Sequence, residues 1–290
     1  MLREIQVRGH VLTYNEHSEG EKIFIFINGW SSFQYFWRPV IDSFKQLGKI
    51  ITLDLPGHAP ARVPENFDHL DMHELIEIES EAVRQIAGGK KVHLIGHSAG
   101  GFVVIGIAAK YPELVESVVA ICPAVHGPVR GFLYPVKLGY EVLQTSLMSF
   151  IQKAVMVPFF SMELFFSFAV KDKDEFFERP EIQYFLKQYH KYFQLLDPRV
   201  MGIYLLMFDK CDLRPLAKNV QIPTLILVGK EDRVVPAEHG IELSRIMPNS
   251  RLIVLENSGH VPILEEREES IGLILDWLRT QKDSSIEVVI

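Results

Sequence analysis

The 290-residue chain has few cysteines, no excess of positive charge and no long apolar run. Two cysteines, Cys122 and Cys211, are too few for a disulfide framework, so we expect both to be reduced and structural. A net charge of -7 and a pI near 5.9 argue against nucleic acid as the main partner. No apolar run reaches the roughly 18 residues that span a bilayer. The first residues do not form the basic start and apolar segment of a signal peptide. From these absences we expect a cytoplasmic protein.

Short apolar runs alternate with amphipathic stretches through most of the chain, which predicts an α/β fold with a mostly parallel central sheet flanked by helices. The first two runs are short and close together, so we expect them to form an antiparallel hairpin at the sheet edge. The predicted strands are 5–7, 11–14, 22–27, 49–54, 92–95, 115–122, 223–229 and 251–255. The predicted helices are about 35–47, 71–86, 101–110, 237–246 and 263–280.

The alternation stops in the middle of the chain. Twelve of the 19 phenylalanines lie between residues 130 and 215, in a helical pattern that prolines divide into several helices. We therefore predict an all-helical cap at 125–215, inserted into a core domain made of 1–124 and 216–290. Packing against the core alone would account for the aromatic residues. They would equally suit an apolar substrate pocket, or a membrane contact through the cap, which remains open but is not predicted.

The sequence Gly96-His97-Ser98-Ala99-Gly100 joins a buried strand directly to a helix. Strand, sharp turn and helix are the context of a nucleophile elbow, in which the serine hydroxyl projects above the sheet. Gly96 and Gly100 suit this turn because a Cβ at either position would clash where strand and helix approach. Ser98 is therefore the candidate nucleophile, and the Ala99 N–H is a candidate oxyanion donor.

A serine hydroxyl needs a base, and the base needs an acid that orients it. Reactive groups in an open parallel sheet gather at the carboxyl ends of its strands. Downstream of Ser98, Asp232 follows the predicted strand 223–229 and His260 follows 251–255. The order Ser98, Asp232, His260 predicts a triad in which His260 takes the serine proton and Asp232 holds the imidazole.

Four motifs give the chain a resemblance to the α/β-hydrolase superfamily over nearly its whole length. They are Gly96–Gly101, Asp54-Leu55-Pro56-Gly57-His58, Gly229–Pro236 and Ser258-Gly259-His260. The resemblance implies a serine hydrolase without a cofactor and an oxyanion hole made by the backbone N–H groups of Trp30 and Ala99. The oxyanion loop of the family usually begins with His, whereas this chain has Asn28, which changes the hydrogen bonds that hold the loop.

Several of these residues also have structural interpretations. Ser98 could be a turn serine, Asp232 could cap the following helix, and His260 could be a surface histidine. His97 fits a packing residue better than a base. No cluster of histidine, cysteine and carboxylate residues predicts a metal site. Candidate substrate contacts are Asn28, Trp30, His97, Phe159 and Phe165.

Taken together, these features predict a serine hydrolase that cleaves an ester or thioester of a hydrophobic acid through an acyl-enzyme on Ser98. The expected partner is a hydrophobic small-molecule substrate. The same triad could serve C–C bond hydrolysis, cofactor-free haloperoxidation, acyl transfer or lyase chemistry. A third hypothesis is a non-catalytic ligand-binding or receptor protein on a hydrolase fold.

Overall fold

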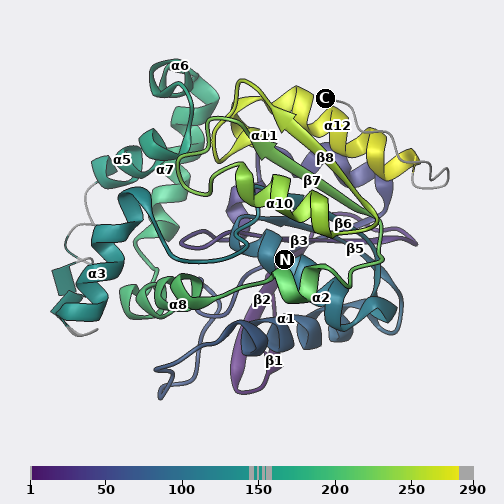
Figure 1. Ribbon diagram of the computed structural model, residues 1–290, viewed down its shortest axis with the longest axis horizontal. Coiled ribbons are helices and arrows are strands. Elements are labelled where there is room, and N and C mark those ends of the chain that lie inside the picture. Colours follow the sequence, from purple (N-terminus) through teal and green to yellow (C-terminus); the bar gives the residue numbers. More distant parts are fainter. Residues whose placement is uncertain (1, 144–146, 149, 152–153, 155–158, 281–290) are drawn as a thin grey trace.

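A single eight-stranded sheet runs through the protein, with helices packed against it (Figure 1). The computed structural model describes residues 2–280 except 144–146, 149, 152–153 and 155–158, and no side chains at 159–161. The strands are β1 Leu2–Val7, β2 His10–Glu16, β3 Ile23–Ile27, β4 Lys49–Leu53, β5 Val92–His97, β6 Val115–Ile121, β7 Thr224–Gly229 and β8 Ser250–Leu255. Their order across the sheet is β1-β2-β4-β3-β5-β6-β7-β8.

The first two strands are antiparallel, and every pairing from β4 through β8 is parallel. The predicted hairpin and the predicted α/β class are therefore confirmed. All residues of β3, β5 and β7 are buried, which suits their mostly apolar sequences in a sheet covered on both faces.

The register places the ends of the central strands side by side. Ile27 at the end of β3 pairs with Gly96 in β5, and Gly229 at the end of β7 pairs with Leu255 at the end of β8. The loops that follow β3, β5, β7 and β8 therefore start from one edge of the sheet. This edge is where ligands bind in open parallel sheets.

The helices that alternate with the strands are α1 Met72–Ala87, α2 Ala99–Lys110, α10 Glu238–Ile246, α11 Pro262–Glu265 and α12 Arg267–Thr280. Helix α1 begins as predicted: Asp71 accepts hydrogen bonds from the N–H groups of His73 and Glu74. It ends at Gly88, whose φ of 58° is left-handed. The predicted helix 263–280 is divided into α11 and α12.

The prediction of one helix over about 35–47 is wrong. The structure has two short 3₁₀ helices there, η1 Gln34–Trp37 and η2 Ile41–Leu47. Pro39 lies between them. Proline lacks the N–H group that would donate to the carbonyl four residues earlier, so it interrupts the helix despite the apolar spacing. Two other short 3₁₀ helices are η3 Pro112–Leu114 and η4 Gly131–Leu133.

Between β6 and β7 the chain leaves the sheet and forms a group of helices. These are α3 Tyr134–Val142, α5 Phe159–Ala169, α6 Lys173–Glu178, α7 Pro180–Phe193 and α8 Pro198–Lys210, which we call the inserted helices; α9 Arg214–Ala217 follows them. Figure 1 shows the inserted helices together on the left, beside the sheet. Within the described residues, no helix has the length and apolar character needed to cross a membrane.

Candidate active site

Ser98 lies in the sharp turn between β5 and α2. Its backbone has φ 55° and ψ −114°, a conformation rare for a residue with a side chain. A Cβ on Gly96 would collide with the backbone of Gly100, and one on Gly100 would collide with the carbonyl oxygen of Ile27. The turn is therefore close-packed as the sequence predicts. The Ser98 N–H donates to the Ile121 carbonyl at 2.8 Å, which fixes the turn to β6.

The predicted acid and base are joined by a hydrogen bond. Asp232 Oδ2 lies 2.7 Å from His260 Nδ1, and both side chains are almost fully buried. The other oxygen of Asp232 accepts the N–H groups of Val234 and Val235, each at 2.8 Å. With Nδ1 donating to the carboxylate, the neutral ring has its lone pair on Nε2, as a general base for a hydroxyl requires.

The loop that carries His260 is held from several directions. Glu265 accepts hydrogen bonds from the N–H groups of Gly259 and Val261 and from the N–H of Lys171. Burial raises the pKa of Glu265 above its usual value. The His260 N–H donates to the Ala169 carbonyl at 2.6 Å, so the end of α5 also fixes this loop.

His97 is the last residue of β5, directly before Ser98, and it supports the loop that carries His260. Its Nε2–H donates to the His260 carbonyl at 2.7 Å, and its ring stacks on Phe36. Burial lowers the pKa of His97 to about 3, so the ring is neutral. The structure places His97 as a support for His260.

The loop after β3 packs directly against the elbow. A Cβ on Gly29 would lie 3.1 Å from Ser98 Cβ, so a side chain here would be crowded and its neighbours would have to shift. The Trp30 indole N–H donates to the Met201 carbonyl at 3.0 Å, and the Ser31 N–H donates to His58 Nε2 at 3.2 Å. Burial lowers the pKa of His58 to about 4, which keeps Nε2 available as an acceptor.

Asn28 is fully buried and does not make the contacts that hold this loop to its neighbours. Its Nδ2 group donates to the adjacent Gly29 carbonyl at 3.3 Å, and its Oδ1 has no partner among the described residues. The loop depends on Trp30 and His58 instead. The stabilising role of His58 had no signal in the sequence beyond its membership of the Asp54–His58 motif.

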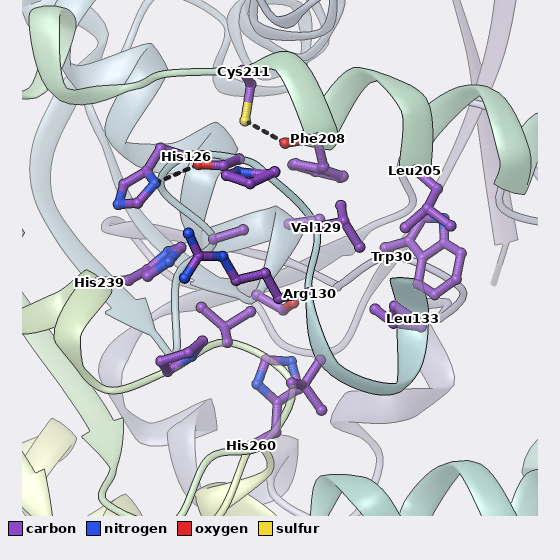
Figure 2. Close-up of a pocket in the computed structure, with 18 of the residues that line it drawn as sticks. Trp30, His126, Val129, Arg130, Leu133, Leu205, Phe208, Cys211, His239 and His260 are labelled. Carbon is purple, nitrogen blue, oxygen red and sulfur yellow. Dashed lines mark hydrogen bonds between the residues drawn. The ribbon is translucent and has the colours of Figure 1, made fainter. Parts of the chain in front are cut away.

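A cavity of about 450 Å³ opens above the elbow (Figure 2). Ser98, Ala99, Trp30 and His260 all line it, so the elbow, the predicted oxyanion loop and the predicted base face the same cavity. Its other residues are Ala124, His126, Gly127, Pro128, Val129, Arg130, Leu133, Phe165, Leu205, Phe208, Cys211, Val234, Val235, Pro236, Glu238, His239 and Glu242.

The predicted substrate contacts divide in the structure. Trp30 and Phe165 line the cavity. Asn28 and His97 are buried and are not lining residues. Phe159 begins α5, but its side chain lies outside the described residues. Sequence reasoning missed His239, Arg130 and Glu265, because no local pattern distinguishes them from surface residues or packing residues.

One trio of potential metal ligands is present within the described part of the chain. Cys122, Asp232 and His260 offer ligand atoms within 4.8 Å of one another. The sequence did not predict this trio, because Cys122 is far from the other two along the chain. Asp232 and His260 are already hydrogen-bonded to each other. Burial raises the pKa of the Cys122 thiol well above its usual value. This environment favours the protonated thiol over a thiolate ligand.

The chain is similar to known hydrolases along most of its length. It is 25% identical to the pimeloyl-[acyl-carrier protein] methyl ester esterase of Hamiltonella defensa, over 89% of this chain and 93% of that protein. Identity is 24% to the 2-hydroxy-6-oxo-6-phenylhexa-2,4-dienoate hydrolase of Comamonas testosteroni, over 96% and 94% of the two chains. It is 26% to the mouse monoacylglycerol lipase ABHD6, over 88% and 74%.

Solved structures have the same fold. The enol-lactonase from Burkholderia xenovorans LB400 superimposes with a TM-score of 0.78 at 17% identity, over 96% of this chain and all of that one. An esterase from Thermogutta terrifontis gives 0.76 at 20% identity, over 97% and 98%. Residues 24–271 match the family model described as the alpha/beta hydrolase family. With that match and its hydrolase relatives, the chain belongs to the alpha/beta hydrolase family and is a hydrolase of this fold.

Proposed function

We propose that the protein is a serine esterase that hydrolyses an ester or thioester of a hydrophobic acid through a covalent acyl-enzyme. The observation that carries the proposal is the hydrogen bond of 2.7 Å between Asp232 and His260, on the wall of a cavity that Ser98 also lines. The similarity to an esterase and to a lipase supports ester chemistry.

In the first half of the reaction, Ser98 Oγ attacks the ester carbonyl while His260 Nε2 takes its proton. The carbonyl oxygen becomes an oxyanion that accepts from the N–H groups of Ala99 and Trp30. The bond to the leaving group then breaks, and His260 gives its proton to the departing oxygen or sulfur. Asp232 stabilises the imidazolium formed between these two steps.

In the second half, water enters and attacks the acyl carbon. His260 takes a proton from this water, the new oxyanion occupies the same two N–H groups, and the Ser98–acyl bond breaks. The proton returns to Ser98 Oγ and the free acid leaves. One water is consumed for each ester cleaved.

We also propose that residues 125–215 act as a cap that selects the substrate. Phe165 from α5 and both Leu205 and Phe208 from α8 line the cavity, so inserted helices supply apolar side chains above the elbow. An acyl chain or aromatic group would bury apolar surface against them.

Hydrolysis of a p-nitrophenyl ester series from acetate to palmitate, by wild type and by Ser98→Ala, tests this proposal. We expect a burst and turnover with a chain-length optimum in the wild type, and neither in the variant. Equal turnover by both proteins, with correct folding of each, would contradict the proposal.

C–C bond hydrolysis is the second candidate, because the relative from Comamonas testosteroni is named as a 2-hydroxy-6-oxo-6-phenylhexa-2,4-dienoate hydrolase and matches 96% of this chain. Loss of absorbance from a vinylogous ring-fission dienoate, at a rate above that of the best ester, would favour this candidate. Both reactions would depend on Ser98, so the substrate and not the variant discriminates them.

A further inference from the structure

The cavity has an apolar end and a polar end. Figure 2 shows Trp30, Leu133 and Leu205 on one side, His126 and His239 on the other, and His260 between them. A substrate whose ester lies at Ser98 and His260 would therefore extend in one direction against apolar side chains. In the other direction it would meet hydrogen-bonding groups.

Arg130 occupies the polar end. Its backbone is in the segment after Gly127, and its guanidinium reaches toward His126 and His239 (Figure 2). Within the described residues, Arg130 makes no hydrogen bond and no ion pair, although it lines the cavity. A guanidinium carries five donors and a permanent charge, so it is suited to a planar anion.

The segment that carries Arg130 is itself fixed. The Gly127 N–H donates to the Cys211 carbonyl at 3.0 Å, and the Val129 N–H donates to Asp209 Oδ1 at 2.9 Å. The backbone just before Arg130 is thus hydrogen-bonded to Asp209 near the end of α8 and to Cys211, the residue that follows α8. Only the side chain needs to be ordered when a ligand binds.

His239 supplies a second donor at the same end. The Val125 N–H donates to its Nδ1 at 3.2 Å, and burial lowers the pKa of the ring to about 4. The neutral ring therefore has its hydrogen on Nε2, which has no acceptor among the residues the structure describes. Its neighbour His126 stacks on it at 4.3 Å, but both nitrogens of that ring are already engaged, by Gly127 and Glu242.

Two carboxylates also face this end and must be counted. Glu242 has one oxygen on Arg214 and the other on His126, so both of its oxygens are occupied, although Arg214 also pairs with both oxygens of Asp212. Glu238 is exposed in the first turn of α10 and lines the cavity. Among the described lining residues, Arg130 and His239 therefore have donors without a partner, and Glu238 is a carboxylate that could compete with a ligand for them.

We propose that Arg130 and His239 form a carboxylate-binding subsite, so that the ester substrate carries an anionic group on the side of Ser98 opposite the apolar end. This inference rests on the proposed esterase function and narrows its substrate class. A carboxylate would accept two hydrogen bonds from the guanidinium and one from His239 Nε2. The anion could belong to the acid or to the alcohol portion of the ester, and the two sources are separable by synthesis.

Two pairs of matched esters test the subsite in the intact protein. On the acid side, 4-nitrophenyl hemi-adipate is compared with its neutral amide, 4-nitrophenyl adipamate. On the alcohol side, 4-carboxyphenyl hexanoate is compared with 4-carbamoylphenyl hexanoate. We expect the anionic member of one pair to have a kcat/KM about tenfold above its amide, a preference that decreases with ionic strength.

The Arg130→Ala variant should lose this preference and leave the kcat/KM of the neutral esters within about twofold. Arg130→Lys should keep part of it, since charge remains without the planar pair of donors. Arg245→Ala is the matched control: this arginine is exposed on α10 and lies outside the cavity lining. Arg130 is exposed as well, so its replacement should leave the melting temperature unchanged.

Either of two results would overturn the subsite. One is that neither anionic ester is preferred by the wild type. The other is that Arg130→Ala and Glu238→Gln lower neutral and anionic esters alike, which would make Arg130 the ion-pair partner of Glu238. Calorimetric binding of adipate to Ser98→Ala separates this inference from the proposed reaction. Arg130-dependent binding without ester turnover would retain the subsite and reject the esterase.

Discussion

The loops at the sheet edge and the inserted helices both line one cavity, and they are built differently. Ser98, Asp232 and His260 are held by backbone hydrogen bonds, by buried acids and by glycines that leave no space for a side chain. By contrast, the exposed large hydrophobic side chains of the described residues, Leu2 apart, all lie in the inserted helices and the segments that connect them, between Tyr134 and Leu195. The sheet-edge loops are thus fixed by specific polar contacts and close packing, whereas the inserted segment presents apolar surface.

The two walls are also joined. The His260 N–H donates to Ala169 at the end of α5, and the Lys171 N–H donates to Glu265 in α11. The Arg179 guanidinium adds bonds to the carbonyl oxygens of Leu264 and Glu265. This part of the inserted segment therefore helps to position the base as well as to line the cavity. We therefore expect this joint to separate the residues of the inserted helices that position the base from those that select the substrate.

The largest effect should come from the sheet-edge wall. Asp232→Asn would remove the carboxylate that orients His260 and stabilises its charge, so we expect kcat to fall about 10⁴-fold. Steady-state kinetics on the best p-nitrophenyl ester measure the change, with circular dichroism as the check on folding. A loss smaller than tenfold would show that this acid is not part of the catalytic machinery.

The close packing of the elbow should be the next most sensitive feature. A Cβ at Gly100 meets the carbonyl oxygens of Ile27 and Asn28, so Gly100→Ala should lower the free energy of unfolding by about 3 kcal/mol. Gly272 in α12 is the matched control, because nothing lies within 4 Å of its added Cβ. Gly272→Ala should raise stability by about 0.5–1 kcal/mol. Urea unfolding of both variants gives the comparison, and equal effects would contradict it.

A smaller effect tests the joint between the walls. Glu265→Gln would place amide hydrogens against N–H donors of the His260 loop, which we expect to cost about 1–3 kcal/mol of stability. The kcat should fall about tenfold with KM nearly unchanged, because the loop positions the base and does not contact substrate. Glu266→Gln, one residue away, is the control and should behave as wild type. A change in KM alone would contradict a positioning role for Glu265.

The smallest effect belongs to the inserted helices. Phe165→Ala should lower kcat/KM for long-chain p-nitrophenyl esters about tenfold relative to acetate, because Phe165 lines the cavity and a long acyl chain would bury more apolar surface there. Leu164→Ala changes an exposed neighbour on α5 and should leave the chain-length profile unchanged. If both variants lowered acetate and palmitate turnover equally, the inserted helices would not select by chain length.

The same contrast explains what the sequence could predict. The elbow and helix α1 with its Asp71 cap depend on short local signals, and the structure has both. The order Ser98, Asp232, His260 rests on local signals too; Asp232 and His260 lie 2.7 Å apart, and the catalytic triad stays a prediction. The single helix predicted over 35–47 is wrong because Pro39 interrupts it despite the apolar spacing. Arg130, His239 and Glu265 come together only through tertiary contacts between distant segments, for which a single sequence contains no local signal.

Covalent labelling of Ser98 is the most direct test of the central claim. Wild type, Ser98→Ala and His260→Ala would each be treated with a fluorophosphonate and examined by intact-mass and peptide mass spectrometry. We predict one adduct per chain on Ser98 in the wild type, none in Ser98→Ala and strongly slowed labelling in His260→Ala. An unlabelled but folded wild type, or an adduct on another residue, would contradict a triad-activated nucleophile at Ser98.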